Sequence, residues 1–228
     1  SKAGVVSVLH QFAPIKERIE IVRNSRNHQI DKKQYPYASV DKESRPIIAA
    51  AIGFEDALEQ ACQLIDAGGN RVVFDSQNGY TPAFQDITAH IAETIGTIRD
   101  KKDTNVVLGS GNIATANGVE EIARAGVQVV KVGIGPGTGC GTGPEIGAHI
   151  PQMTALIDTY EAAVENNVQI ISDGGIKKPL DMNKALMFSH AVMAGSILSA
   201  TYESSAVKQR NLEGVLFANY KGSGSNEA

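Results

Sequence analysis

The chain has 228 residues, of which 42% are hydrophobic and 23 are glycine, and its formal net charge is −4. The length suits one barrel-sized domain, and the negative charge excludes the basic field expected of proteins that bind nucleic acid or an anionic membrane. No apolar run approaches the roughly 20 residues that cross a bilayer, and no charged-then-apolar leader opens the chain. The two cysteines, Cys62 and Cys140, do not make a disulfide framework, so we expect a reduced, cytoplasmic protein.

Short apolar runs, rich in β-branched residues, recur along the chain and predict seven strands. Strands that are buried on both faces of a parallel sheet are expected to be almost wholly apolar. In chain order the runs cover residues 5–9, 47–52, 72–74, 106–108, 129–132, 168–171 and 191–194.

Amphipathic segments between these runs predict helices, most clearly at residues 57–67, 119–125 and 153–164. Strands that alternate with helices indicate βαβ units and a parallel sheet. Seven strands fit either an open, doubly wound sheet or an α/β fold of the TIM (β/α)8 barrel type that lacks one unit. We favour the barrel because Gly or Asp follows most strands, where barrel loops carry a site. We expect the missing βα unit at the N-terminus.

The segment at residues 24–46 is polar, has no periodicity and contains Tyr35-Pro36. These features predict a loop or a linker. It lies between the first two strands, where a barrel can accept an inserted domain.

A glycine-rich loop follows the strand at residues 129–132. It reads Gly133-Ile134-Gly135-Pro136-Gly137-Thr138-Gly139-Cys140. Closely spaced glycines let backbone N–H groups approach an anion, and Thr138 adds a hydroxyl. A thiol near such N–H groups would have a lowered pKa and could act as a nucleophile. The alternatives are a plain turn and an inert, space-filling Cys140.

Three other strand ends carry polar groups. Residues 172–175 read Ser-Asp-Gly-Gly, and Asp173 there can accept hydrogen bonds from ribose hydroxyls. Residues 195–196, Gly-Ser, follow a late strand, where barrels often build a phosphate site. Residues 75–80 read Asp-Ser-Gln-Asn-Gly-Tyr, and Asp75 could bind a second ribose.

Together these motifs resemble the IMP dehydrogenase/GMP reductase family over nearly the whole chain and in order. The matching stretches are Gly111-Asn112-Ile113-Ala114-Thr115, Lys131 to Gly137 with Cys140 three residues on, Pro151-Gln152, Ser172 to Ile176, Val192 to Ser196, Tyr202-Glu203-Ser204 and Tyr220 to Ser225.

The resemblance implies a catalytic role for Cys140, which would attack C2 of a 6-oxopurine nucleotide and form a covalent thioimidate. Hydride would pass to or from NAD or NADP stacked on the purine. Thr142 and Glu203 match a pair that handles protons near the cysteine.

The resemblance also implies binding residues. The substrate nucleotide would contact Thr138, Asp173, Gly174, Gly175, Gly195, Ser196, Tyr220, Ser223 and Gly224. The cofactor would contact Asp75, Ser76, Asn112 and Gly133. Carbonyl oxygens of Gly135, Gly137 and Cys140 would ligate a monovalent cation, K+, and the family suggests a homotetramer.

The chain departs from the family pattern at several places. Gly141-Thr142-Gly143 stands where the family usually has two threonines and a basic residue, and Ser223 stands where it usually has methionine. By comparison with the family pattern, we expect residues 1–228 to lack the first βα unit and the flap that follows the base-binding loop. We expect residues 1–228 to form the catalytic domain, and a regulatory insertion of paired CBS domains would fall within about 24–34.

Two family activities remain open. The stretch from Tyr35 to Asp41 resembles the segment just after the CBS domains in IMP dehydrogenases, and the Gly-Ser-Gly-Ser ending agrees with it. This favours oxidation of IMP to XMP. By contrast, Asn78-Gly79-Tyr80 and Tyr202-Glu203-Ser204 resemble GMP reductases, which convert GMP to IMP with NADPH. A non-catalytic purine-nucleotide-binding relative is a further alternative because of the unusual cysteine loop. A barrel enzyme acting on a sugar phosphate would explain the glycines but not the position of Cys140.

Overall fold

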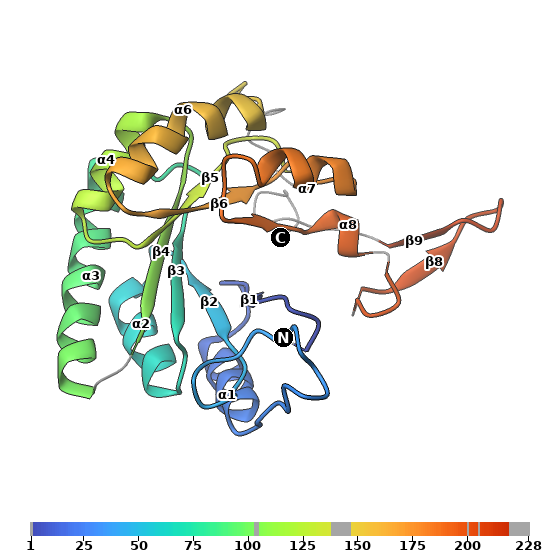
Figure 1. Cartoon of the computed structure of the whole chain (residues 1–228), viewed down its shortest axis with the longest axis horizontal. Coiled ribbons are helices and arrows are strands. Elements are labelled where there is room, and N and C mark those ends of the chain that lie inside the picture. Colours follow the sequence, from blue (N-terminus) through green and yellow to red (C-terminus); the bar gives the residue numbers. More distant parts are fainter. Residues whose placement is uncertain (1, 103–104, 138–146, 200, 205, 219–228) are drawn as a thin grey trace. The chain divides into compact units, whose positions relative to one another are not determined.

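The computed structural model describes residues 2–102, 105–137, 147–199, 201–204 and 206–218 (Figure 1). The chain forms two compact units. Unit 1 comprises Ser1–Ser76, Thr81–Ser110 and Arg124–Gln128, and unit 2 comprises Gln77–Tyr80, Gly111–Ala123 and Val129–Ala228. No helix in the described part of the chain is long and apolar enough to cross a membrane.

Unit 1 contains parallel strands with helices between them. Its elements are β1 (Ser7–Leu9), α1 (Ile15–Arg26), β2 (Ile48–Ile52), α2 (Ala57–Asp66), β3 (Arg71–Asp75) and α3 (Pro82–Lys102). β1 pairs with β2, and β2 pairs with β3, both in parallel. All residues of β2 are buried, as its apolar sequence predicts for a strand covered on both faces. α2 packs against α3 and against the two strands that flank it in sequence.

An aromatic cluster joins the start of α3 to β3. The rings of Phe74 and Phe84 stack with their centroids 4.2 Å apart, and Phe54 packs against both at a steep angle. Phe74 and Phe84 are fully buried, whereas Phe54 is 49% exposed. Such ring pairs stabilise a core beyond the area that they bury.

The segment between α1 and β2 is mostly irregular, as predicted, although α1 extends into its first residues and ends at Arg26. The guanidinium of Arg26 pairs with the carboxylate of Asp41 at 2.6 Å and donates to the carbonyl of Pro46 at 3.1 Å. Backbone N–H groups of Glu43 and Arg45 donate to the same carboxylate. Asp41 therefore fastens the end of this loop to the end of α1.

Unit 2 repeats the alternation of strand and helix. Its elements are α4 (Ala116–Arg124), whose last residue belongs to unit 1, β5 (Val129–Val132), α6 (Gln152–Glu165), β6 (Gln169–Asp173), α7 (Pro179–Ala185), β7 (Ala191–Met193), α8 (Ser196–Ser199), β8 (Lys208–Arg210) and β9 (Leu216–Ala218). β5, β6 and β7 pair in parallel, and β8 and β9 form an antiparallel hairpin. β4 (Val107–Ile113) contributes residues to both units.

Helix α6 shows why the sequence folds this way in unit 2. Its buried residues are Ala155, Leu156, Thr159, Ala162 and Ala163, which recur at the spacing of one helix face. That face packs against β5 and β6. Small side chains on the face let the helix lie close to the sheet.

The order of the strands confirms the barrel-type fold. β1 to β7 follow one another in the sheet in the same order as in the chain. A doubly wound sheet reverses its strand order at a switch point, whereas a (β/α) barrel adds each strand beside the last. All seven predicted strands and the three predicted helices are present.

We predict that Asp41→Asn lowers stability through loss of a partly buried ionic contact. Burial alone would raise the pKa of Asp41, but hydrogen bonds from the Arg45 N–H, the Arg26 side chain and the Glu43 N–H, with the positive charge of Arg26, outweigh it and lower the pKa. The contribution is then fully present above the unfolded pKa of about 4 and is lost as pH falls through the depressed folded pKa. Urea unfolding at pH 7 should show a loss of about 1 kcal/mol.

The matched control is Glu43→Gln, which removes the exposed pair between Arg45 and Glu43 and should leave stability nearly unchanged. The difference between wild type and Asp41→Asn should shrink as the buffer is made acidic. A difference that is independent of pH would contradict the ionic role of Asp41.

Candidate functional site

The predicted site residues divide between described and undescribed parts of the chain. Thr138, Cys140, Thr142, Tyr220, Ser223 and Gly224 lie outside the described residues. Asp75 and Ser76 lie at the end of β3 in unit 1, and the remaining predicted residues lie in unit 2.

Within unit 2, the loop after β6 packs directly against the start of the cysteine loop. Gly174 has a φ of +97°, and a Cβ atom built on it would lie 2.8 Å from Cγ of Pro136 and 3.0 Å from the backbone nitrogen of Gly137. Gly175 comes close to Pro136 as well. The predicted substrate-binding residues Gly174 and Gly175 are therefore in contact with the start of the loop that leads to Cys140.

Gly133 lies at the closest point between these strand ends. Its φ is +145°, and an added Cβ would lie 2.0 Å from the carbonyl oxygen of Asp173 and 2.7 Å from Oε1 of Gln152. Its N–H donates to the carbonyl of Ile113 at 2.9 Å. Since no side chain fits here, glycine is needed for the ends of β4, β5 and β6 to meet.

The carboxylate of Asp173 is the centre of a polar cluster. Its Oδ2 lies 3.0 Å from Nζ of Lys131 and accepts a hydrogen bond of 2.8 Å from Nδ2 of Asn112. The same Nδ2 donates to the carbonyl of Gly133 at 2.7 Å. Residues predicted separately for the substrate ribose and for the cofactor are thus joined by direct hydrogen bonds.

Part of the 75–80 segment reaches the same cluster. The N–H of Gly79 donates to the carbonyl of Asn112 at 2.7 Å. The side chain of Asn78 accepts a hydrogen bond from the N–H of Tyr80 and so shapes the turn. Asn78, Gly79, Tyr80 and Asn112 all belong to unit 2.

Two residues of the cluster had no predicted role. Lys131 is 5% exposed inside an otherwise apolar strand. A charge buried in such a strand needs a partner, and that signal could have marked Lys131 from the sequence. Gln152, the first residue of α6, donates through Nε2 to the carbonyl of Val132 at 2.8 Å and to the hydroxyl of Ser172 at 2.9 Å, a role visible only in the structure.

Two buried acceptor atoms of the cluster have no hydrogen-bond partner in the described structure: Oδ1 of Asn112 and Oε1 of Gln152. The amide nitrogens of both side chains face carbonyl, carboxylate or hydroxyl oxygens. If either amide were flipped, its oxygen would instead lie against a carbonyl oxygen, which is unfavourable. Leaving a buried acceptor without a donor is costly. The side-chain oxygen of Asn112 is therefore suited to accept a hydrogen bond from a bound ligand.

The other predicted residues lie on further elements of the two units. Gly195 and Ser196 lie at the start of α8, where Ser199 donates to the carbonyl of Ser196. Glu203 lies in an exposed turn. In unit 1, the carboxylate of Asp75 accepts a hydrogen bond of 3.4 Å from Gln11. The predicted phosphate-binding, proton-handling and cofactor-ribose roles of these residues stay predictions.

The predicted cation ligands are backbone carbonyls of the cysteine loop. The described residues contain no group of three His, Cys, Asp or Glu side chains that could hold a metal ion. No backbone N–H of a described residue donates to the carbonyl of Gly135 or Gly137, whereas that of Ile134 accepts from Ile150. The predicted role of Gly135 and Gly137 as ligands of K+ stays a prediction.

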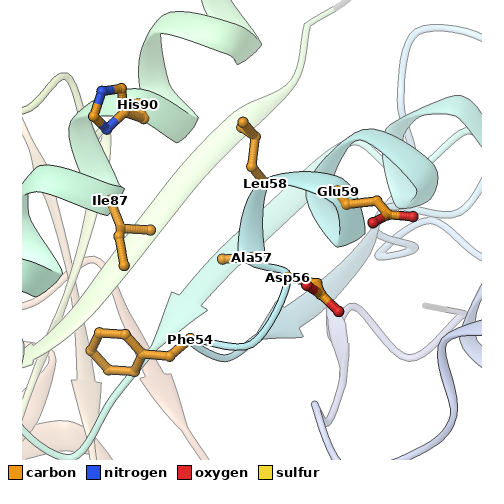
Figure 2. A pocket seen from close by; sticks show the side chains of 7 residues that line it. All are labelled: Phe54, Asp56, Ala57, Leu58, Glu59, Ile87 and His90. Carbon is orange, nitrogen blue, oxygen red and sulfur yellow. The ribbon is translucent and has the colours of Figure 1, made fainter.

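A separate pocket of about 480 Å³ opens on unit 1 (Figure 2). Phe54 lines it from the loop before α2, Leu58 from the first turn of α2, and Ile87 and His90 from α3. None of the predicted site residues lines this pocket, and its walls are largely apolar.

Comparison with known proteins identifies the same family that the motifs resemble. A family model for the IMP dehydrogenase / GMP reductase domain matches residues 1–228. An inosine-5'-monophosphate dehydrogenase of Staphylococcus aureus (strain Mu50) is 37% identical over 194 residues, and that of Staphylococcus saprophyticus is 38% identical over the same length. Each match covers 84% of this chain and 38% of the relative, so the chain matches well under half the length of these curated relatives.

We predict that Gly133→Ala destabilises the protein by about 2–4 kcal/mol. The new methyl group would clash with the backbone of Asp173, and alanine is strained at the positive φ of this position. Urea unfolding of the purified variant would measure the loss. Gly96→Ala is the matched control, since nothing lies within 4 Å of its added Cβ and alanine favours the helix by about 1 kcal/mol. Equal stability of wild type and Gly133→Ala would show that the strand ends do not meet as described.

Proposed function

The chain belongs to the IMP dehydrogenase/GMP reductase family, and on that premise we propose that it is an NAD-dependent IMP dehydrogenase of guanine nucleotide biosynthesis. The observation that carries the proposal is the cluster of Asp173, Asn112 and Lys131 beside the glycine loop that leads to Cys140. The names of the similar staphylococcal proteins support oxidation of IMP as the reaction.

The substrate would be a purine ribonucleoside 5'-monophosphate. Asp173 would accept hydrogen bonds from its ribose, since a carboxylate makes strong, charge-assisted contacts with hydroxyl donors. Gly174, Gly175, Gly195 and Ser196 would approach its phosphate together with Thr138, Tyr220, Ser223 and Gly224. The close packing of Gly174 against the cysteine loop supports a nucleotide held beside Cys140.

Cys140 would act as the nucleophile. Its thiolate adds to C2 of IMP, hydride leaves C2, and a thioimidate remains. Water then replaces the sulfur, which releases XMP and restores the thiol. Thr142 and Glu203 would move the proton of that water. NAD, when bound, would supply the acceptor for this hydride.

Residues of unit 2 fit the cofactor and the cation by donor type. The buried, unpartnered Oδ1 of Asn112 offers an acceptor to a ligand on the cofactor side, together with Gly133. Asp75 and Ser76 would hold its ribose. The carbonyls of Gly135 and Gly137, with that of Cys140, would ligate K+ and order the cysteine loop.

GMP reductase is the second candidate, because Asn78-Gly79-Tyr80 resembles that branch of the family and Gly79 donates directly to Asn112. In that case GMP and NADPH would yield IMP and ammonia at the same cysteine. The unusual Gly141-Thr142-Gly143 sequence favours the third alternative, a purine-nucleotide-binding relative without catalysis.

The wider organisation is part of the proposal. We infer a cytoplasmic homotetramer in which residues 1–228 form the catalytic domain. A CBS-domain insertion within residues 24–34 would enter at the end of α1, ahead of the loop that Asp41 fastens to Arg26.

We predict that the intact protein reduces NAD when given IMP and K+, seen as a rise in absorbance at 340 nm. GMP with NADPH should cause no fall in absorbance. The reverse pattern would establish the reductase, and no change with either pair, while IMP still binds, would establish the non-catalytic relative.

We further predict that 6-chloro-IMP labels Cys140 and spares Cys62. The Cys140 thiolate would add to C2 of this analogue, and loss of chloride from C6 with transfer of a proton from C2 to C6 would leave a stable thioether, whereas Cys62 is half-buried on α2. Excess IMP should protect Cys140. Mass spectrometry of the digested protein would locate the adduct, and labelling of Cys62 alone or of neither cysteine would contradict covalent catalysis at Cys140.

A further inference from the structure

The position of Lys131 follows from the pairing of β5 with β6. In their parallel register Lys131 lies opposite Ile171, and Asp173 lies two residues further along β6. Residues two apart in a strand point to the same face of a sheet, so the ammonium and the carboxylate meet on one face. The Lys131 side chain is 6% exposed and that of Asp173 is 22% exposed. The ammonium of Lys131 is therefore the more deeply buried partner of the pair.

The two oxygens of the Asp173 carboxylate have different surroundings. Oδ2 faces the ammonium of Lys131 at 3.0 Å and the amide nitrogen of Asn112 at 2.8 Å. A carboxylate oxygen has two lone pairs, so these donors occupy both. No described residue donates to Oδ1. A ligand therefore meets one available oxygen of Asp173, not two.

We propose that Lys131 is a positioning residue for sugar recognition, which together with Asn112 holds Oδ2 of Asp173 and so presents Oδ1 to the hydroxyl groups of a ribonucleotide. The inference rests on the proposed function, which places a nucleotide here. Lys131 does not touch the sugar in this arrangement, and its proposed effect on sugar binding passes through Asp173.

If Lys131 were merely structural, it would only neutralise the carboxylate of Asp173. Its substitution would then weaken the binding of all nucleotides to the same extent. A positioning role affects only ligands that carry the ribose hydroxyls. The ratio of two affinities therefore separates these two roles: that of IMP and that of 2',3'-dideoxy-IMP, which has the same base and phosphate but no hydroxyls on the ring.

The test is calorimetric titration of the intact protein with each nucleotide. Wild type should bind IMP about 10–100-fold more tightly than the dideoxy analogue. Lys131→Met should reduce this ratio to about threefold or less, mainly by weakening IMP. Lys131→Arg, which keeps the charge and can donate to Oδ2, should restore part of it. Lys184→Met, on an exposed turn of α7, is the matched control and should leave the ratio unchanged.

A double-variant cycle checks that the effect passes through Asp173. Asp173→Ala alone should bring the ratio of the two affinities to about one. Adding Lys131→Met to Asp173→Ala should then leave the affinity for IMP unchanged. A further loss in the double variant would show that Lys131 acts on the nucleotide independently and would overturn the proposal.

The remaining outcomes also distinguish a structural role of Lys131 from a positioning role. If Lys131→Met keeps the wild-type ratio, or weakens both nucleotides equally, Lys131 is structural and the inference is wrong. If Lys131→Met does not fold, Lys131→Gln replaces it, and retention of the full ratio by that variant contradicts the inference. Failure of wild type to bind IMP at all would instead overturn the proposed function, which distinguishes the two failures.

Discussion

The ends of β4, β5 and β6 can meet because residue 133 has no side chain. The N–H of Gly133 bonds to β4 at Ile113, and the space that a Cβ would need is filled by the backbone of Asp173 and the amide of Gln152. The contacts of Asn112 with Gly133 and with Asp173 depend on this approach. With a larger residue the strand ends would separate, and the carboxylate of Asp173 would move away from Asn112.

The close approach creates a buried polar cluster that must balance its own charges. Removing an ammonium and a carboxylate from water costs several kcal/mol for each ion, and attraction between them repays it only with good geometry and further hydrogen bonds. Here Asn112 supplies such a bond to the carboxylate, while Gln152 ties Val132 to Ser172 next to it. The proposed ligand binding accounts for this cluster better than a stabilising role, because apolar side chains would fill the same space at lower cost.

The buried acceptors left over in this cluster support that view. Oδ1 of Asn112 and Oε1 of Gln152 have no partner in the described structure, although buried polar atoms in folded proteins are nearly always paired. Polar groups held at a strand end by rigid neighbours lose little freedom when a ligand binds. Unit 2 gives these groups a firm support, because the helix α6 packs against β5 and β6.

Much of the fold was determined by the sequence alone, because apolar runs and amphipathic spacing are local properties. They located all seven strands and the helices α2, α4 and α6, and strand-end glycines next to Asp173 and Cys140 indicated where chemistry would lie. α3 was not singled out, since its polar and apolar residues show little segregation, and the hairpin of β8 and β9 is too short for a clear pattern. What only the tertiary structure decided is which strand ends share atoms. Asn112 and Asp173 are 61 residues apart in the chain, and the contacts of Lys131 and Gln152 depend on parallel register and on an approach within a few ångströms at Gly133. Those quantities arise from packing between distant segments, which no local pattern of residues encodes.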